Sequence, residues 1–325
     1  MKKVILILLC LGFFCSGALA QEITASTEVT SREITVPAKQ RFNIGAGYWY
    51  TWAKMDMKLL ADTAWINSGL ANKGDKVSEL DNDLDSGMVI VNAEAWIWWR
   101  LYVDGFIGWG NCDGSHEDSD WIPAMSGSKW SLSKSDASGD VVTLNANGYL
   151  RIIDEPEDKG YLDFSLGYFY YKDDIEHIKN TRVEIYNWGA VNIPLSGHDS
   201  SDRYTFDGLR LGARGKIRIM DRLALKGSIG VCPWLDVKKK WYWNLAGHKG
   251  TGDADGTAFD VDVSVEFKIT KNIFIEAGYK YINLNSDDGD LHWDYYNSGL
   301  TETDKNVWNV EGHRGGFYGM GRLKF

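Results

Sequence analysis

Residues 259–269 read Phe-Asp-Val-Asp-Val-Ser-Val-Glu-Phe-Lys-Ile, so every second side chain in this stretch is apolar. The same alternation recurs in 140–153, 161–174 and 207–219. Successive side chains of a β-strand point to opposite faces, so each stretch predicts a strand with one apolar and one polar face. Such strands build either a soluble sandwich, with the apolar face inside, or a transmembrane barrel, with the apolar face against lipid.

Three features favour the transmembrane barrel. The alternating segments are about 10 residues or longer, as a tilted membrane strand requires. Short and long connections alternate along the chain, as expected for periplasmic turns and extracellular loops. The short connections lie near 99–100, 154–160, 220–222 and 271–272, and the long ones cover 54–76, 112–139, 175–206, 244–257 and 287–309. The last seven residues, 319–325, alternate and end in Phe325, which resembles the C-terminal strand of bacterial outer-membrane proteins.

The sequence therefore predicts an all-β fold, a ten-stranded antiparallel transmembrane β-barrel over residues 41–325. Its turns on the periplasmic side should be short and its extracellular loops long. An even number of strands places both ends of the barrel on the periplasmic side. The ten predicted strands lie near 41–53, 86–98, 100–111, 140–153, 161–174, 207–219, 222–243, 257–270, 272–286 and 310–325.

The N-terminus predicts export to the bacterial outer membrane. Lys2 and Lys3 precede an apolar run, and Ala18-Leu19-Ala20 matches the small-residue pattern of a signal-peptide cleavage site. We expect residues 1–20 to be a cleaved signal peptide and residues 21–40, which are polar and rich in Thr, to form a periplasmic lead-in. After cleavage, 33 Lys and Arg face 45 Asp and Glu, a net charge of −12. This balance argues against nucleic acid as a partner.

Charged side chains also alternate into the predicted lumen. About eight strands make a barrel that side chains just fill, whereas about 16 leave a wide channel. Ten strands with many long charged side chains should therefore be closed by ion pairs rather than open as a porin. Of the four cysteines, Cys10 and Cys15 leave with the signal, and the remaining Cys112 and Cys232 are best interpreted as two isolated apolar thiols.

Asp118-Ser119-Asp120-Trp121, after the third predicted strand, is the strongest local motif. In an extended segment, Asp118 and Asp120 point the same way, and two close carboxylates suit general acid/base work on a water molecule. With ten strands, the terminal Phe325, the stretch 76–81 and Gly110, this motif resembles the omptins, which are outer-membrane endopeptidases. The resemblance implies that Asp118 and Asp120 are half of a catalytic site, that cleavage prefers basic residues, and that the barrel contacts lipopolysaccharide.

The other half of an omptin site is an Asp-x-His pair in the loop after the seventh strand. Residues 234–244 contain no such pair here. His248 follows this region, and Asp290-Leu291-His292 lies between the last two predicted strands. An imidazole oriented by a neighbouring carboxylate can act as a general base. The candidate catalytic residues are therefore Asp118, Asp120, His248, Asp290 and His292.

Acidic residues gather in the predicted extracellular segments, where a rim of one sign attracts cationic ligands. Residues 81–87 resemble the start of a calcium loop and 287–290 are strongly acidic, although solvated acid is the simpler interpretation of both. No cofactor is otherwise expected. The missing Asp-x-His favours a surface barrel for adhesion, envelope structure or ligand binding, with lipid, lipopolysaccharide, cationic peptides or host surface molecules as partners. The alternative is an omptin-like endopeptidase.

Overall fold

The structure is a computed structural model that describes residues 42–125, 128–155, 159–185, 189–195, 200–243, 247–296 and 298–325. The predicted signal peptide, residues 1–20, and the predicted lead-in, residues 21–40, lie outside the described residues. Within the described residues, no helix is long and apolar enough to cross a membrane.

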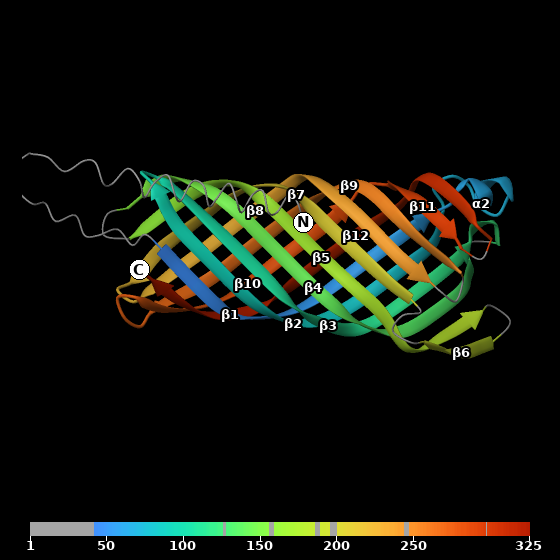
Figure 1. Ribbon diagram of the computed structural model, residues 1–325, viewed down its shortest axis with the longest axis horizontal. Helices are drawn as coiled ribbons and strands as arrows, with labels where there is room; N and C mark the ends of the chain where they lie inside the picture. The colour runs from blue at the N-terminus through green and yellow to red at the C-terminus, as the bar shows by residue number, and fades with distance from the viewer. Residues whose placement is uncertain are drawn as a thin grey trace, which may run out of the picture.

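Ten antiparallel strands close into a ring, as predicted (Figure 1). Each strand pairs with the next along the ring, and pairing between the first and last strands closes the barrel. In ring order the strands are β1 (Phe42–Leu60), β2 (Lys76–Trp98), β3 (Leu101–Ile122), β4 (Ser128–Asp154), β5 (Gly160–Ile185), β7 (Ser200–Met220), β8 (Leu223–Trp243), β9 (His248–Lys268), β10 (Ile273–Ser286) and β12 (Leu300–Lys324).

In the part of the chain that the structure describes, four further elements lie outside the ring. They are β6 (Gly189–Leu195), which pairs with β5, β11 (Gly289–Tyr295), which pairs with β9 and β12, the short helix α2 (Thr63–Asn67) and the 3₁₀ turn η2 (Pro123–Met125). Figure 1 shows β6, β11 and α2 at one end of the barrel and the C-terminus at the other. The C-terminal end also carries the short turns at 99–100, 221–222 and 269–272, so it is the periplasmic end.

The alternation in residues 259–269 separates an outward-facing apolar set from an inward-facing polar set, as a membrane barrel predicts. Val263, Val265 and Phe267 are exposed on the outer surface, whereas Ser264 and Glu266 between them are buried in the lumen. A soluble sandwich would bury the apolar set instead. An apolar outer face and a polar interior therefore place this part of the sheet in lipid.

The strands extend further at the outer end than the sequence predicts. The third strand was predicted to end at 111 but continues to Ile122, and the fourth was predicted to start at 140 but starts at Ser128. Much of the predicted long loops 54–76, 112–139, 175–206, 244–257 and 287–309 is therefore sheet. The apolar alternation stops where lipid stops, but backbone hydrogen bonding between neighbouring strands continues beyond it.

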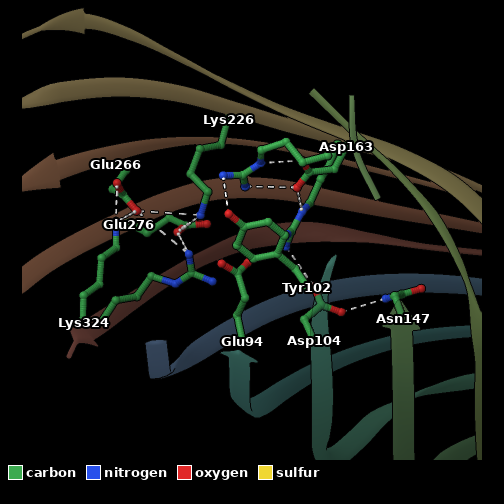
Figure 2. A network of polar contacts seen from close by, with 12 residues as sticks. Glu94, Tyr102, Asp104, Asn147, Asp163, Lys226, Glu266, Glu276 and Lys324 are labelled. Atoms are coloured by element: carbon green, nitrogen blue, oxygen red, sulfur yellow. Dashed lines mark hydrogen bonds and ion pairs between the residues drawn. The ribbon is translucent and has the colours of Figure 1, made fainter. Parts of the chain in front are cut away.

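The lumen is closed by ion pairs at the level of the membrane. Arg214 on β7 bonds Glu94 (Nη1 to Oε2, 2.5 Å), Asp104 (Nη1 to Oδ2, 3.3 Å) and Asp163 (Nε to Oδ2, 2.9 Å). Its guanidinium also lies 3.7 Å from the ring centroid of Tyr149. Figure 2 shows several of these carboxylates converging from separate strands.

A second cluster lies nearer the periplasmic end. Lys226 bonds Glu276 (2.6 Å), and Lys324 bonds Glu266 (3.0 Å), as Figure 2 shows. Arg322 also pairs with Glu276 at 3.1 Å. The cavity among these groups measures only about 120 Å³, so the lumen is filled, as expected. Both cysteines of the barrel, Cys112 and Cys232, are buried and free.

Candidate functional site

A cavity of about 530 Å³ opens at the outer end of the barrel. Its walls come from the outer extensions of the ring strands together with α2 and β11, far from the periplasmic turns. Asp118 and Asp120 line it, as do His116, His177 and Asp202. The cavity is thus where ionisable side chains from several strands meet.

The Asp pair is built by alternation in β3. Asp118 and Asp120 lie two residues apart on the same face, and Ser78 of β2 lies opposite Asp120. The Ser78 hydroxyl donates to Asp118 Oδ1 at 3.1 Å, and the Ser131 hydroxyl donates to Asp120 Oδ2 at 2.5 Å. Burial and the neighbouring Asp120 raise the pKa of Asp118 to about 8, and burial also raises the pKa of Asp120. Each carboxylate is therefore positioned by a serine.

An imidazole pair lies beside these carboxylates. The rings of His116 on β3 and His177 on β5 stack, with centroids 3.8 Å apart and planes inclined by 17°. The His116 Nδ1 lies 3.0 Å from Asn82 Oδ1, and the His177 Nδ1 lies 2.8 Å from Ser200 Oγ. Burial lowers the pKa of His177 and, with the His177 ring beside it, places the pKa of His116 well below its usual value.

Asp202 and Lys239 complete the polar wall. Asp202 Oδ2 lies 3.4 Å from His177 Nε2, and Asp202 Oδ1 lies 2.9 Å from Lys239 Nζ. Burial alone would raise the pKa of Asp202, but Lys239 and the imidazoles lower it. Lys239 Nζ also lies 2.8 Å from Met57 Sδ. Asp202 thus stays ionised between a histidine and a lysine.

An aromatic wall forms another part of the cavity lining. The rings of Trp241 and Trp293 meet edge to face at 4.9 Å, and His248 packs against Trp293 at 5.5 Å. Asp304 also lines the cavity, and burial together with Asp62 and other acidic neighbours raises the pKa of Asp304 to about 6. The cavity therefore presents flat aromatic faces on one side and acidic groups around them.

The structure brings together three of the five predicted catalytic residues. Asp118, Asp120 and His248 all line the cavity, with His248 in its aromatic wall. The remaining two, Asp290 and His292, lie on β11 and are not among the described residues that line the cavity. His292 is exposed and its Nδ1 lies 2.8 Å from Thr303 Oγ1, while Asp290 accepts a hydrogen bond from the backbone of Asn306. The acidic stretch 81–87, predicted as a loop, lies within β2.

Sequence reasoning missed His116, His177, Asp202 and Lys239. His116 could have been found, because it lies two residues before Asp118 and so shares its strand face. His177 and Asp202 carry no spacing signal. They meet because the register of β5 and β7 places 175 opposite 202, which only the sheet reveals.

Comparisons with known proteins agree with this architecture. The family model for the OmpA-like transmembrane domain matches residues 101–307. The outer membrane protease OmpT from Escherichia coli has a similar structure, with a TM-score of 0.79 over 92% of this chain and 100% of that chain at 14% sequence identity. A search of curated protein sequences gives no significant match.

Two other solved structures are less similar. The translocator domain of the autotransporter NalP from Neisseria meningitidis matches with a TM-score of 0.34 at 11% identity, covering 100% of this chain and 98% of that one. Ail, the attachment invasion locus protein of Yersinia pestis, matches with a TM-score of 0.26 at 10% identity, covering 86% and 99%. The family match and the lipid-facing barrel lead to one conclusion: this chain is an outer-membrane β-barrel that belongs to the OmpA-like transmembrane domain family.

Proposed function

We propose that this barrel is an outer-membrane endopeptidase that cleaves peptides carrying basic side chains. The observation that carries the proposal is the meeting of the Asp118/Asp120 pair with the His116/His177 pair in one cavity at the outer end. Sequence alone favoured a non-enzymatic barrel because no Asp-x-His pair followed the seventh strand. Histidines supplied by β3 and β5 remove that objection. The fold shared with a protease, OmpT, is consistent with the proposal.

The chemistry needs a water molecule, groups that hold it and a proton acceptor. Asp118 and Asp120 are the proposed groups that hold the water. His116 is the proposed acceptor, in the tautomer in which Nδ1 donates to the amide oxygen of Asn82, 3.0 Å away, and Nε2 carries the lone pair. The water oxygen would bond the peptide carbonyl carbon, its proton would pass to His116, and that proton would then reach the departing amine as the C–N bond breaks.

Charge around the cavity supports a basic substrate. Five aspartates line it, at positions 62, 118, 120, 202 and 304, and Lys239 is the only Lys or Arg among the described lining residues. Asp118, with its pKa of about 8, is mostly protonated at neutral pH, but the other acidic side chains still outnumber Lys239. An excess of negative charge attracts cationic ligands and speeds their approach. The faces of Trp241 and Trp293 add surfaces on which a guanidinium or ammonium group can stack.

The test is hydrolysis of dibasic peptides by the purified barrel in detergent micelles containing lipopolysaccharide. We expect Asp120→Asn and His116→Gln each to lower kcat/KM by at least about 100-fold, which is the scale of general acid/base catalysis. His292→Asn is the matched control, because His292 is exposed and bonded to Thr303, and it should retain wild-type activity. Equal activity of the wild type and the Asp120 variant would exclude this site.

A ligand-binding function is the second candidate, and the aromatic wall favours it. Trp241, Trp293 and His248 form a continuous surface beside the acidic groups, whether or not hydrolysis occurs. Binding without cleavage is measured by the quenching of tryptophan fluorescence as peptide is added. Saturable quenching in a barrel that cleaves no peptide would support this candidate over the endopeptidase.

A further inference from the structure

Three buried side chains at the floor of the outer cavity form a group with the composition of a transition-metal site. They are His116 on β3, His177 on β5 and Asp202 on β7, and one potential ligand atom from each lies within 4.8 Å of the other two. Their exposed fractions are 6%, 4% and 2%. Within the described residues, this is the one such group of three histidine, cysteine or acidic side chains.

Each of the two rings has one nitrogen atom near the other potential ligand atoms. The His116 Nδ1 lies 3.0 Å from Asn82 Oδ1, and in the tautomer that donates there Nε2 carries the lone pair. The His177 Nδ1 is bonded to Ser200 Oγ at 2.8 Å. The His177 Nε2 has no hydrogen-bond partner, although it is buried and lies 3.4 Å from Asp202 Oδ2. A positive ion bound to both atoms would stabilise a buried ring nitrogen and a carboxylate oxygen at this distance.

Protonation of both imidazole rings is a poor substitute for that ion. The two rings stack at 3.8 Å, and two imidazolium rings at that separation would repel each other. Neutral imidazoles bind metals through lone pairs that lie in the ring planes, so an ion shared by both rings would require them to turn out of this near-parallel stack.

Neighbouring groups support the three ligands as outer-shell partners do in metal proteins. Asn82 and Ser200 each contact the far nitrogen of one imidazole, as hydrogen-bond partners of metal-binding histidines do. Lys239 occupies Asp202 Oδ1 and leaves Oδ2 facing His177.

We propose that His116, His177 and Asp202 bind a divalent transition-metal ion of the Zn²⁺ class. Two imidazole nitrogens and one carboxylate oxygen match the ligands of Zn²⁺, whereas Ca²⁺ and Mg²⁺ take six or more oxygen ligands. All three residues line the cavity, so a fourth position faces its interior. The metal site is independent of the proposed hydrolysis, because a bound ion would occupy the His116 lone pair that hydrolysis uses for a proton. Metal binding is therefore measured without any substrate.

The test is titration of the purified, metal-stripped barrel with CoCl₂ and ZnCl₂ in detergent micelles. We expect one Co²⁺ per chain with the intense visible absorption of a four-coordinate site containing nitrogen, and we expect Zn²⁺ to displace it. His177→Asn and Asp202→Asn should each weaken Zn²⁺ binding by at least about tenfold, as the loss of a ligand or its support does. The matched control, His292→Asn, should bind as the wild type does.

Two results would overturn the site. One is equal Zn²⁺ affinity in the wild type and the His177 and Asp202 variants, which would assign the ion to acidic groups elsewhere. The other is the weak absorption of an octahedral, all-oxygen Co²⁺ complex in the wild type, a result that needs no variant to fold. Peptide cleavage is measured separately on the metal-stripped barrel, so a barrel that binds Zn²⁺ but cleaves no peptide in its metal-free form would refute only the endopeptidase.

Discussion

Replacing Arg214 by Met tests whether ion pairs hold the lumen together. Arg214 bonds Glu94 at 2.5 Å and Asp163 at 2.9 Å, and all three side chains lie inside the barrel. Removing one partner of a buried pair costs about 3–5 kcal/mol because the other charge stays buried. Asp163 keeps Arg151 at 2.8 Å, whereas Glu94 and Asp104 lose this partner. Because the side chains of Glu94 and Asp104 are partly exposed, the lower end, about 3 kcal/mol, applies. Losing the contact with Tyr149 adds about 1 kcal/mol.

We therefore expect Arg214→Met to lower the free energy of unfolding by about 4 kcal/mol, the sum of the buried-pair and cation–π terms. The measurement is equilibrium unfolding in guanidinium chloride from lipid vesicles, followed by tryptophan fluorescence. Lys54→Met is the control, because Lys54 and Asp56 pair at 3.1 Å on the surface, and losing an exposed pair costs less than about 1 kcal/mol.

Adding Glu94→Gln to Arg214→Met should recover part of the lost stability, because a neutral amide needs no cation. The reasoning is refuted if Arg214→Met costs no more than Lys54→Met. It is also refuted if the double variant is no more stable than the single one.

Two further predictions concern the closing seam and the outer rim. A Cβ atom at Gly316 would lie 1.9 Å from the backbone oxygen of Tyr50, so Gly316→Ala should force β1 and β12 apart and sharply reduce the folded fraction seen on unheated SDS gels. Gly319→Ala, where nothing lies within 4 Å, should fold normally, and equal folding of both variants would contradict the steric argument. The pKa of Asp304 is raised to about 6, so ionising this group costs stability above pH 6 and nothing below about pH 4. After allowing for screening by water, Asp304→Asn should be about 1 kcal/mol more stable than the wild type at pH 8 and equal to it at pH 4. Thermal unfolding measures this difference, and a difference in stability that is independent of pH would contradict the prediction.

The membrane-level part of the fold could be predicted because lipid imposes a signal on the sequence. Residues 259–269 alternate strictly, since one face meets hydrocarbon and the other the charged lumen. Above the membrane both faces of a strand can be polar, so residues 112–122 carry no apolar alternation and β3 was predicted to end too early. Hydrogen bonding between strands, rather than hydrophobicity, defines these outer extensions. A single sequence contains no pattern that indicates this hydrogen bonding.

The candidate site was only half predictable for the same reason. Asp118 and Asp120 are neighbours on one strand, so their spacing alone places both carboxylates on one face. His177 and Asp202 are neighbours only across β5 and β7, where a register shift of one residue would turn one of them away from the cavity. Local patterns thus reveal sites built within a strand, whereas sites built across strands depend on register.

Charges at the two levels of the barrel have opposite arrangements, and the difference explains where chemistry can occur. At the level of the membrane, each carboxylate of the Arg214 cluster has a cationic partner, so those charges stabilise the fold and leave little to attract a ligand. At the outer end, five aspartates share the cavity with Lys239 alone among the described Lys and Arg. Unpaired carboxylates cost stability, and they are retained where a cation is to be bound. A metal ion between the imidazoles and a basic peptide against the aromatic wall would both relieve that excess, and they would do so at different depths of the same cavity.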